Sequence, residues 1–148
     1  MAVEQVHFLS PGAPDQRTGG YLYDAHILSG LAALGIRVET HVIPGRFPGP
    51  DPVSAEAALG LLRGLPDGGL VILDGLLHAS LADILPAESR RLKLVSILHH
   101  PLALESGLSE TESQVLLEAE RRAVSGQRLI VVSSPMTART LAAALGRG

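Results

Sequence analysis

Residues 92–98 read Leu-Lys-Leu-Val-Ser-Ile-Leu, an almost continuously apolar run of strand length. Three other short runs are similarly apolar, as expected of parallel strands that helices cover on both faces. Between the runs lie longer stretches whose apolar residues recur with helical spacing. This alternation predicts βαβ units around a parallel sheet and therefore an α/β fold. The predicted strands are Val6–Leu9, Ile36–Ile43, Leu70–Leu73, Leu92–Leu98 and Leu129–Val132.

The second predicted strand differs from the others, because Arg37, Glu39 and His41 alternate with its apolar residues. One face of this strand should be wetter, and we expect the strand to lie towards an edge of the sheet. Right-handed crossovers predict a Rossmann-like, doubly wound sheet of about five strands, for which we expect the order 3-2-1-4-5. Ligands of such sheets bind at the carboxyl ends of the strands. The loops of interest therefore follow Leu9, Leu73, Leu98 and Val132.

Helix signals separate the strands. An apolar stripe runs through Gly20–Leu34, and Gly35 follows where a left-handed C-cap is expected. Ser109 and Glu112 have capping-box spacing, and Ser134 followed by proline predicts the start of the last helix. Further helices are predicted at Val53–Arg63 and His78–Leu85, and the proline-rich segment Pro44–Pro52 is predicted to be an irregular surface excursion.

Composition narrows the function classes. The 148 residues are 46% hydrophobic, enough for one substantial core, and we expect a single domain. The net charge is -3 and the sequence has no basic run, so it lacks the basic patch expected of a protein that binds nucleic acid or an anionic membrane. The absence of cysteine excludes disulfides and a catalytic thiol, and it fits a cytoplasmic protein. The apolar runs are of strand length, so we expect no membrane-spanning segment.

A long polar loop after the first predicted strand delivers two glycines, Gly19 and Gly20, to the start of a helix. The free N–H groups at a helix start suit a phosphate, and glycine allows a ligand to approach the backbone closely. The glycine spacing is neither that of the dinucleotide-binding fingerprint nor that of a P-loop. Two roles of Gly19 and Gly20 therefore stay open at this point: contact with a phosphate, or only a turn of the chain.

Two predicted strands end in polar side chains. His99 and His100 follow the fourth strand, and imidazole can orient a sugar hydroxyl, shuttle a proton or bind metal. Adjacent side chains of an extended segment point to opposite sides, which disfavours one metal ion shared by both. Asp74 closes the third strand before Gly75, where its carboxylate could hold a ligand hydroxyl or cap a turn. His7, His26, His41 and His78 lie inside predicted strands and helices and receive no predicted role.

Several of these motifs together resemble the amino-terminal half of the family 4 retaining glycosyltransferases. The stretch Gly19-Gly20-Tyr21-Leu22-Tyr23, followed by Leu31-Ala32-Ala33-Leu34-Gly35-Ile36-Arg37-Val38, looks like the opening of that family. His99-His100-Pro101 is similar to the family's histidine loop, and Val131-Val132-Ser133-Ser134 with Thr137-Ala138 and Leu141 resembles a later segment. The order and spacing of the motifs agree over nearly the whole chain.

The resemblance implies a GT-B enzyme that transfers a sugar from a nucleotide-sugar donor to an acceptor without an essential metal or cofactor. Residues 1–148 are then the amino-terminal, acceptor-side domain, and the carboxyl-terminal donor-binding domain is a missing partner. Carried over by position, Gly19 and Gly20 contact the donor diphosphate. His99, or His100 as the fallback, touches the transferred sugar or the acceptor, and Asp74 lies on the acceptor side. We expect these residues alone to be inactive, since half a cleft lacks most groups that stabilise the leaving diphosphate.

Two other functions stay open. A nucleotide-binding module of another kind is compatible with the fold, although the dinucleotide-binding glycine fingerprint is missing. A non-catalytic Rossmann-like interaction module, flavodoxin-like or completed by a separate chain, is the second. A receiver domain is disfavoured, because it needs clustered acidic residues after the first strand and a lysine after the fifth.

Overall fold

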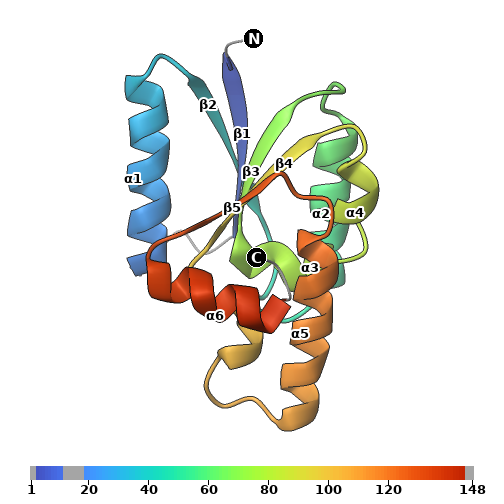
Figure 1. Cartoon of the computed structure of the whole chain (residues 1–148). Helices are drawn as coiled ribbons and strands as arrows, with labels where there is room; N and C mark the ends of the chain where they lie inside the picture. Colours follow the sequence, from blue (N-terminus) through green and yellow to red (C-terminus); the bar gives the residue numbers. More distant parts are fainter. Residues whose placement is uncertain (1–2, 12–18, 146–148) are drawn as a thin grey trace.

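The structure, a computed structural model, describes residues 3–11 and 19–145 and contains one sheet of five parallel strands (Figure 1). Its strands agree closely with the five predicted from the apolar runs, and the α/β fold with a Rossmann-like parallel sheet is confirmed. The strands are β1 (Gln5–Pro11), β2 (Arg37–Ile43), β3 (Leu70–Asp74), β4 (Lys93–Leu98) and β5 (Leu129–Val132).

The helices begin and end where local signals predict. Gly35 has a φ of 85° after α1, Ser109 and Glu112 form both hydrogen bonds of a capping box, and the Ser134 hydroxyl accepts from Thr137 N. The helix predicted at His78–Leu85 is shorter than expected: it ends at Leu81, and a separate short helix begins at Leu85. The helices are α1 (Gly19–Ala33), α2 (Pro52–Arg63), α3 (His78–Leu81), α4 (Leu85–Glu88), α5 (Glu110–Val124) and α6 (Pro135–Leu145), with 3-10 turns η1 (Gly75–Leu77) and η2 (Leu102–Leu104).

The strand order is β2-β1-β3-β4-β5, so the predicted order 3-2-1-4-5 is wrong. That order would have placed β2 inside the sheet, although four of its seven residues are exposed. β3 is buried along almost its whole length, because it lies between β1 and β4 with helices on both sides. The polar alternation of β2 had predicted an edge position correctly, and the apolar β3 takes the central place that it needs.

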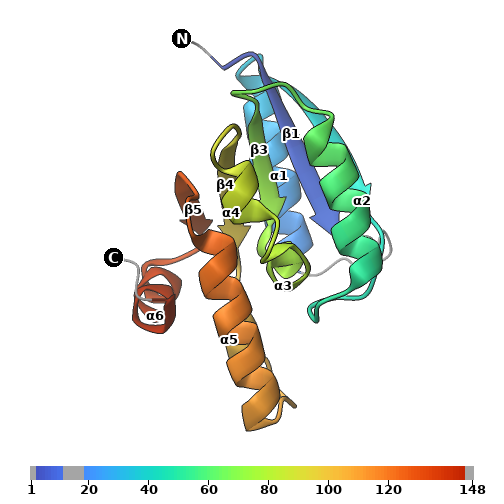
Figure 2. The same cartoon turned by 90° about the vertical axis from the view of Figure 1, so that its right-hand side faces the viewer.

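Two hydrophobic layers enclose the sheet, which Figure 1 shows nearly edge-on between α1 and the pair α2 and α4. On one face Val6, Phe8 and Ile72 pack against apolar residues of α1. On the other face Leu9 and Leu73 pack with α2, α3 and α4. Figure 2 shows α5 projecting past the ends of the strands, so that its first turns stand beside η2.

The sheet changes its winding direction between β1 and β3. From β1 the chain crosses through α1 to β2, whereas from β3 it proceeds to β4 in the opposite direction along the sheet. In open parallel sheets this switch point leaves a crevice at the carboxyl ends of the two strands, where ligands bind. The end of β3 and the start of α1 are therefore where a site is expected.

Candidate functional site

The last residue of β3, Asp74, lies at this switch point with both carboxylate oxygens in use. Its Oδ1 accepts a hydrogen bond of 2.8 Å from Leu76 N and so caps η1. Its Oδ2 lies 3.6 Å from Nε2 of His99. The sequence left open whether Asp74 caps a turn or serves a site, and the geometry provides for both roles.

Gly75 lets the turn after β3 lie directly against the end of β4. A Cβ at this position would be 3.1 Å from Cγ of Leu98 and 3.3 Å from the carbonyl oxygen of Ile97. These approaches are tighter than ordinary van der Waals contact. The missing side chain therefore allows Asp74 to come close to His99.

His99 follows β4 directly and is held by two carboxylates. Its Nε2 lies 2.9 Å from Oδ1 of Asp24, a residue of α1. The Asp24 and Asp74 side chains are 6% and 5% exposed, whereas the His99 side chain is 23% exposed. The Tyr23 and His99 rings meet in a T-shaped contact, with ring centroids 5.5 Å apart, and the Tyr23 hydroxyl donates to the Val132 carbonyl. The buried carboxylates and Tyr23 thus orient the imidazole from the protein interior, and part of the ring remains accessible to solvent.

The three ionisable groups strongly change one another's protonation. Hydrogen bonds to Asp24 and then Asp74 raise the pKa of His99 from 6.5 to about 9. Burial, reinforced by the neighbouring Asp74 carboxylate, raises the pKa of Asp24 from 3.8 to about 7. Burial also opposes the ionisation of Asp74, but hydrogen bonds from His99, Asp24 and Leu76 N outweigh it and lower the pKa of Asp74.

This electrostatic arrangement favours a charged hydrogen-bond donor over a base. Near neutral pH, Asp74 is ionised, His99 is an imidazolium, and Asp24 is close to half protonation. Both ring nitrogens of an imidazolium carry protons, and Nδ1 makes no hydrogen bond to any residue that the structure describes. His99 can therefore donate a charged hydrogen bond to a hydroxyl or phosphate oxygen.

The same three side chains include ligand atoms within 4.8 Å of one another, close enough to surround a metal ion. A metal ion requires a lone pair on the histidine nitrogen. The Nε2 of His99 is protonated at neutral pH and already faces both carboxylates. The cluster is therefore satisfied by its own hydrogen bond and ion pair, and a metal ion at this place would have to displace the proton on Nε2.

The sequence could not choose between the two adjacent histidines, and the structure separates them. His99 contacts both Asp24 and Asp74. The half-exposed His100 side chain contacts neither of them and lies 3.9 Å from Oε2 of Glu105. Gly19 and Gly20 are the first two residues of α1. The preceding segment 12–18 of the predicted phosphate loop lies outside the described residues.

Sequence reasoning missed Asp24, although a signal was present. It is the sole Asp, Glu, Lys or Arg from Gly19 to Ala33, within a helix of high apolar content. It is 4% exposed and lies beside Tyr23, which packs in the apolar layer under α1. An isolated carboxylate on the buried side of a helix requires a partner, and here the partner is His99.

A fully buried polar network supports the histidine segment from the other side of β4. His78 Nδ1 lies 2.8 Å from Glu120 Oε2, and His78 Nε2 lies 2.8 Å from the Ser96 hydroxyl. The second Glu120 oxygen accepts from Leu102 N, three residues after His99. His78, Glu120 and Ser96 are at most 1% exposed, so this serine–histidine–glutamate set has no substrate access. It connects α3, β4 and α5 and fixes the start of η2.

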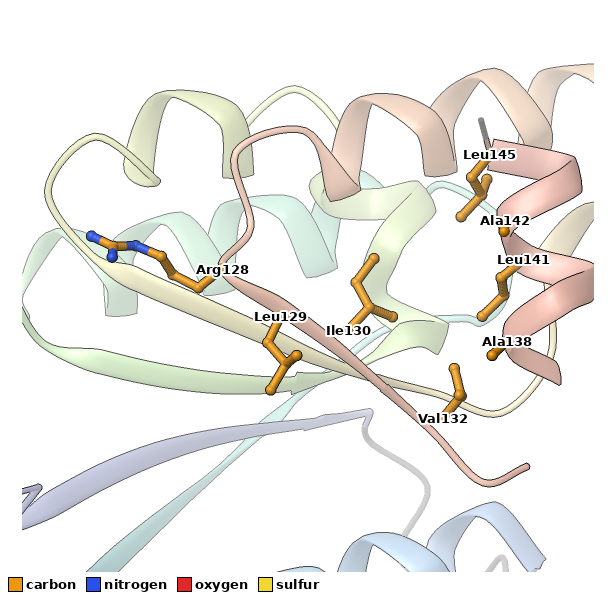
Figure 3. Close-up of a pocket in the computed structure, with 8 residues that line it drawn as sticks. All are labelled: Arg128, Leu129, Ile130, Val132, Ala138, Leu141, Ala142 and Leu145. Carbon is orange, nitrogen blue, oxygen red and sulfur yellow. The ribbon is translucent and has the colours of Figure 1, made fainter. Parts of the chain in front are cut away.

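A separate hollow of about 320 Å³ lies between the edge strand β5 and α6 (Figure 3). Leu129, Ile130 and Leu141 are among its lining residues, and Arg128 contributes the charged side chain in the view. Specific ligand sites combine an apolar lining with a few converging polar groups. The described lining of this hollow has no such group of side chains, so the Asp24–Asp74–His99 cluster is the stronger candidate.

No family model matches this chain, and no curated protein shows significant similarity to it. Within the described residues, no helix has both the length and the apolar character required to cross a membrane.

Proposed function

We propose that this chain forms the acceptor side of a glycosyltransferase cleft, where a sugar passes from a nucleotide-sugar donor to an acceptor. One observation carries the proposal: His99 is held by two buried carboxylates at the switch point of the sheet, close to the end of β3. The motifs around Gly19, His99 and Ser134, which resemble family 4 glycosyltransferases, support the same assignment.

The proposed role of His99 is to donate a hydrogen bond. Its raised pKa keeps the imidazole charged at neutral pH, so Nδ1 can donate to a hydroxyl of the transferred sugar or of the acceptor. Such a bond fixes the position of that hydroxyl, whereas the negative charge of the transition state develops on the leaving diphosphate. Asp24 and Asp74 act by holding the ring in one orientation and by keeping it protonated.

The proposed contact to the donor diphosphate comes from the start of α1. The first N–H groups of a helix have no partner within the helix and carry partial positive charge. Gly19 and Gly20 begin this helix, and Asp24 lies one turn further along it. In the proposed enzyme, most donor contacts belong to a second half that closes over this surface.

The proposal can be tested by titrating the 148-residue chain, labelled with ¹⁵N, with a nucleoside diphosphate and separately with simple methyl glycosides. We expect saturable chemical-shift changes at Gly19, Gly20 and the imidazole of His99. A His99→Gln variant should lose the response to glycosides. His26→Gln should keep it, because His26 is an exposed residue of α1 outside the proposed site. Absence of any saturable response at millimolar ligand would refute the proposal.

The strand order favours one alternative, a nucleotide-binding module without transferase activity. The order β2-β1-β3-β4-β5 is that of flavodoxin-like domains, which bind flavin mononucleotide at the same switch point. The two functions differ in their ligands. Tight binding of a flavin or nicotinamide nucleotide, without a response to glycosides, would favour the alternative.

A further inference from the structure

A second cluster of ionisable side chains lies on the edge of the sheet formed by β1 and β2. In the parallel register His7 is opposite Glu39, and Leu9 is opposite His41. Successive side chains of a strand alternate between faces, so Glu39 and His41 share one face. Val6 and Phe8 pack on the α1 side, which places His7 on the opposite face, together with Leu9.

The ligand atoms of these residues are spaced as around a small metal ion. Nδ1 of His7 and Nε2 of His41 are 3.1 Å apart. The Glu39 carboxylate approaches them at 3.7 Å and 3.9 Å, one oxygen towards each ring. A tetrahedral zinc ion with bonds of about 2.1 Å separates its ligand atoms by about 3.4 Å. Small side-chain rotations therefore bring two nitrogens and one oxygen onto three corners of a tetrahedron.

The surroundings hold these side chains in place and still admit an ion. The His7 and His41 side chains are 13% and 18% exposed, and Glu39 is 53% exposed. The two imidazoles lie within 24° of parallel and meet edge to edge through the hydrogen bond between His7 Nδ1 and His41 Nε2, so both nitrogens already face the space between the rings. The Gln5 amide donates to Oε2 of Glu39 at 3.1 Å and so orients the carboxylate, as outer-shell partners of metal ligands do.

From this geometry we propose that His7, Glu39 and His41 form a binding site for a divalent transition-metal ion of the zinc type. Two imidazoles and one carboxylate suit zinc, whereas magnesium and calcium prefer oxygen ligands alone. The site is separate from the Asp24–Asp74–His99 cluster. His7 is opposite Val71 of β3, three residues or about 10 Å before Asp74.

The bound ion joins the edge strand β2 to β1. Its ligands come from both strands, and binding to the folded state alone stabilises that state. The role assigned to the site is therefore to hold the edge strand in the sheet. The three protein ligands leave the fourth position of a tetrahedral ion open to water. This inference does not depend on the proposed glycosyltransferase function.

The test is calorimetric titration of the metal-free chain with zinc chloride at a pH where histidines are mostly neutral. We expect a single zinc ion per chain and a rise in the unfolding temperature with added zinc. Glu39→Gln and His41→Gln should each weaken binding by at least about tenfold, a change that loss of an outer-shell partner already causes at many sites. His26→Gln serves as the matched histidine control and should bind as the unsubstituted chain does.

Three results overturn the proposal: no saturable zinc binding, unchanged binding by both variants, or loss of binding in Asp24→Asn. The last result would place the ion in the other cluster. Because the Glu39 side chain is half-exposed, Glu39→Gln should leave the fold intact, and circular dichroism without metal checks this. If His41→Gln fails to fold, Glu39→Gln and the zinc-dependent unfolding temperature still decide the question.

Discussion

Oδ1 of Asp24 lies 2.9 Å from Nε2 of His99, although 75 positions separate the two residues in the chain. One comes from the buried side of a helix and the other from the end of a central strand. Because Asp74 approaches the same nitrogen, the protonation of all three groups is linked. The first two predictions follow from this linkage.

His99 should titrate far above an ordinary histidine. Nuclear magnetic resonance of its imidazole is expected to give a pKa near 9 in the unsubstituted chain. Asp24→Asn removes the largest cause of the shift and should bring the pKa of His99 down towards 6.5. Titration of His99 near 6.5 in both proteins would show that the carboxylates do not hold the ring.

The free energy of unfolding should fall as pH rises from about 4 to about 9. The folded protein binds a proton at Asp24 more tightly than the unfolded chain does between 3.8 and about 7. The same holds for His99 between 6.5 and about 9, so each rise in pH removes stability in these windows. The lowered pKa of Asp74 acts oppositely, and only below 3.8. Urea unfolding at several pH values should show a flatter profile in the Asp24→Asn, His99→Gln double variant.

Glu120→Ala should destabilise the protein strongly. The substitution leaves two buried groups, the His78 imidazole and Leu102 N, without their acceptor. Each unsatisfied group costs about 1–3 kcal/mol. Glu118→Ala on the exposed side of the same helix is the control and should change stability by less than about 0.5 kcal/mol. Equal effects of the two substitutions in chemical denaturation would contradict a structural role of the buried network.

Gly75→Ala and Gly60→Ala should have opposite effects on stability. A Cβ at Gly75 meets Leu98 and the Ile97 carbonyl, and such overpacking costs about 1–3 kcal/mol. A Cβ at Gly60, inside α2, meets nothing within 4 Å, and alanine there should stabilise the helix by about 0.5–1 kcal/mol. Thermal unfolding compares the two. Gly75→Ala should also change the imidazole resonances of His99, which Gly60→Ala should leave unaltered.

The sequence alone was sufficient to predict the five strands, most of the helices and the presence of a histidine at the end of β4. These features depend on local causes. Apolar runs are buried because removing apolar surface from water is favourable. Gly35, Ser109 and Ser134 terminate helices through backbone conformation or hydrogen bonds to residues close in sequence. A reader of the sequence can evaluate each of these effects without knowing the rest of the fold.

Tertiary structure decided the strand order and the partners of each polar side chain. The position of β3 between β1 and β4 depends on which arrangement best buries an apolar strand, and this is a property of the whole sheet. That position brings Asp74 to His99, while α1 brings Asp24 to the same nitrogen. The clusters His7–Glu39–His41 and His78–Glu120–Ser96 likewise join distant segments. Sequence spacing carries no information about such contacts, because long-range packing determines which strands and helices become neighbours.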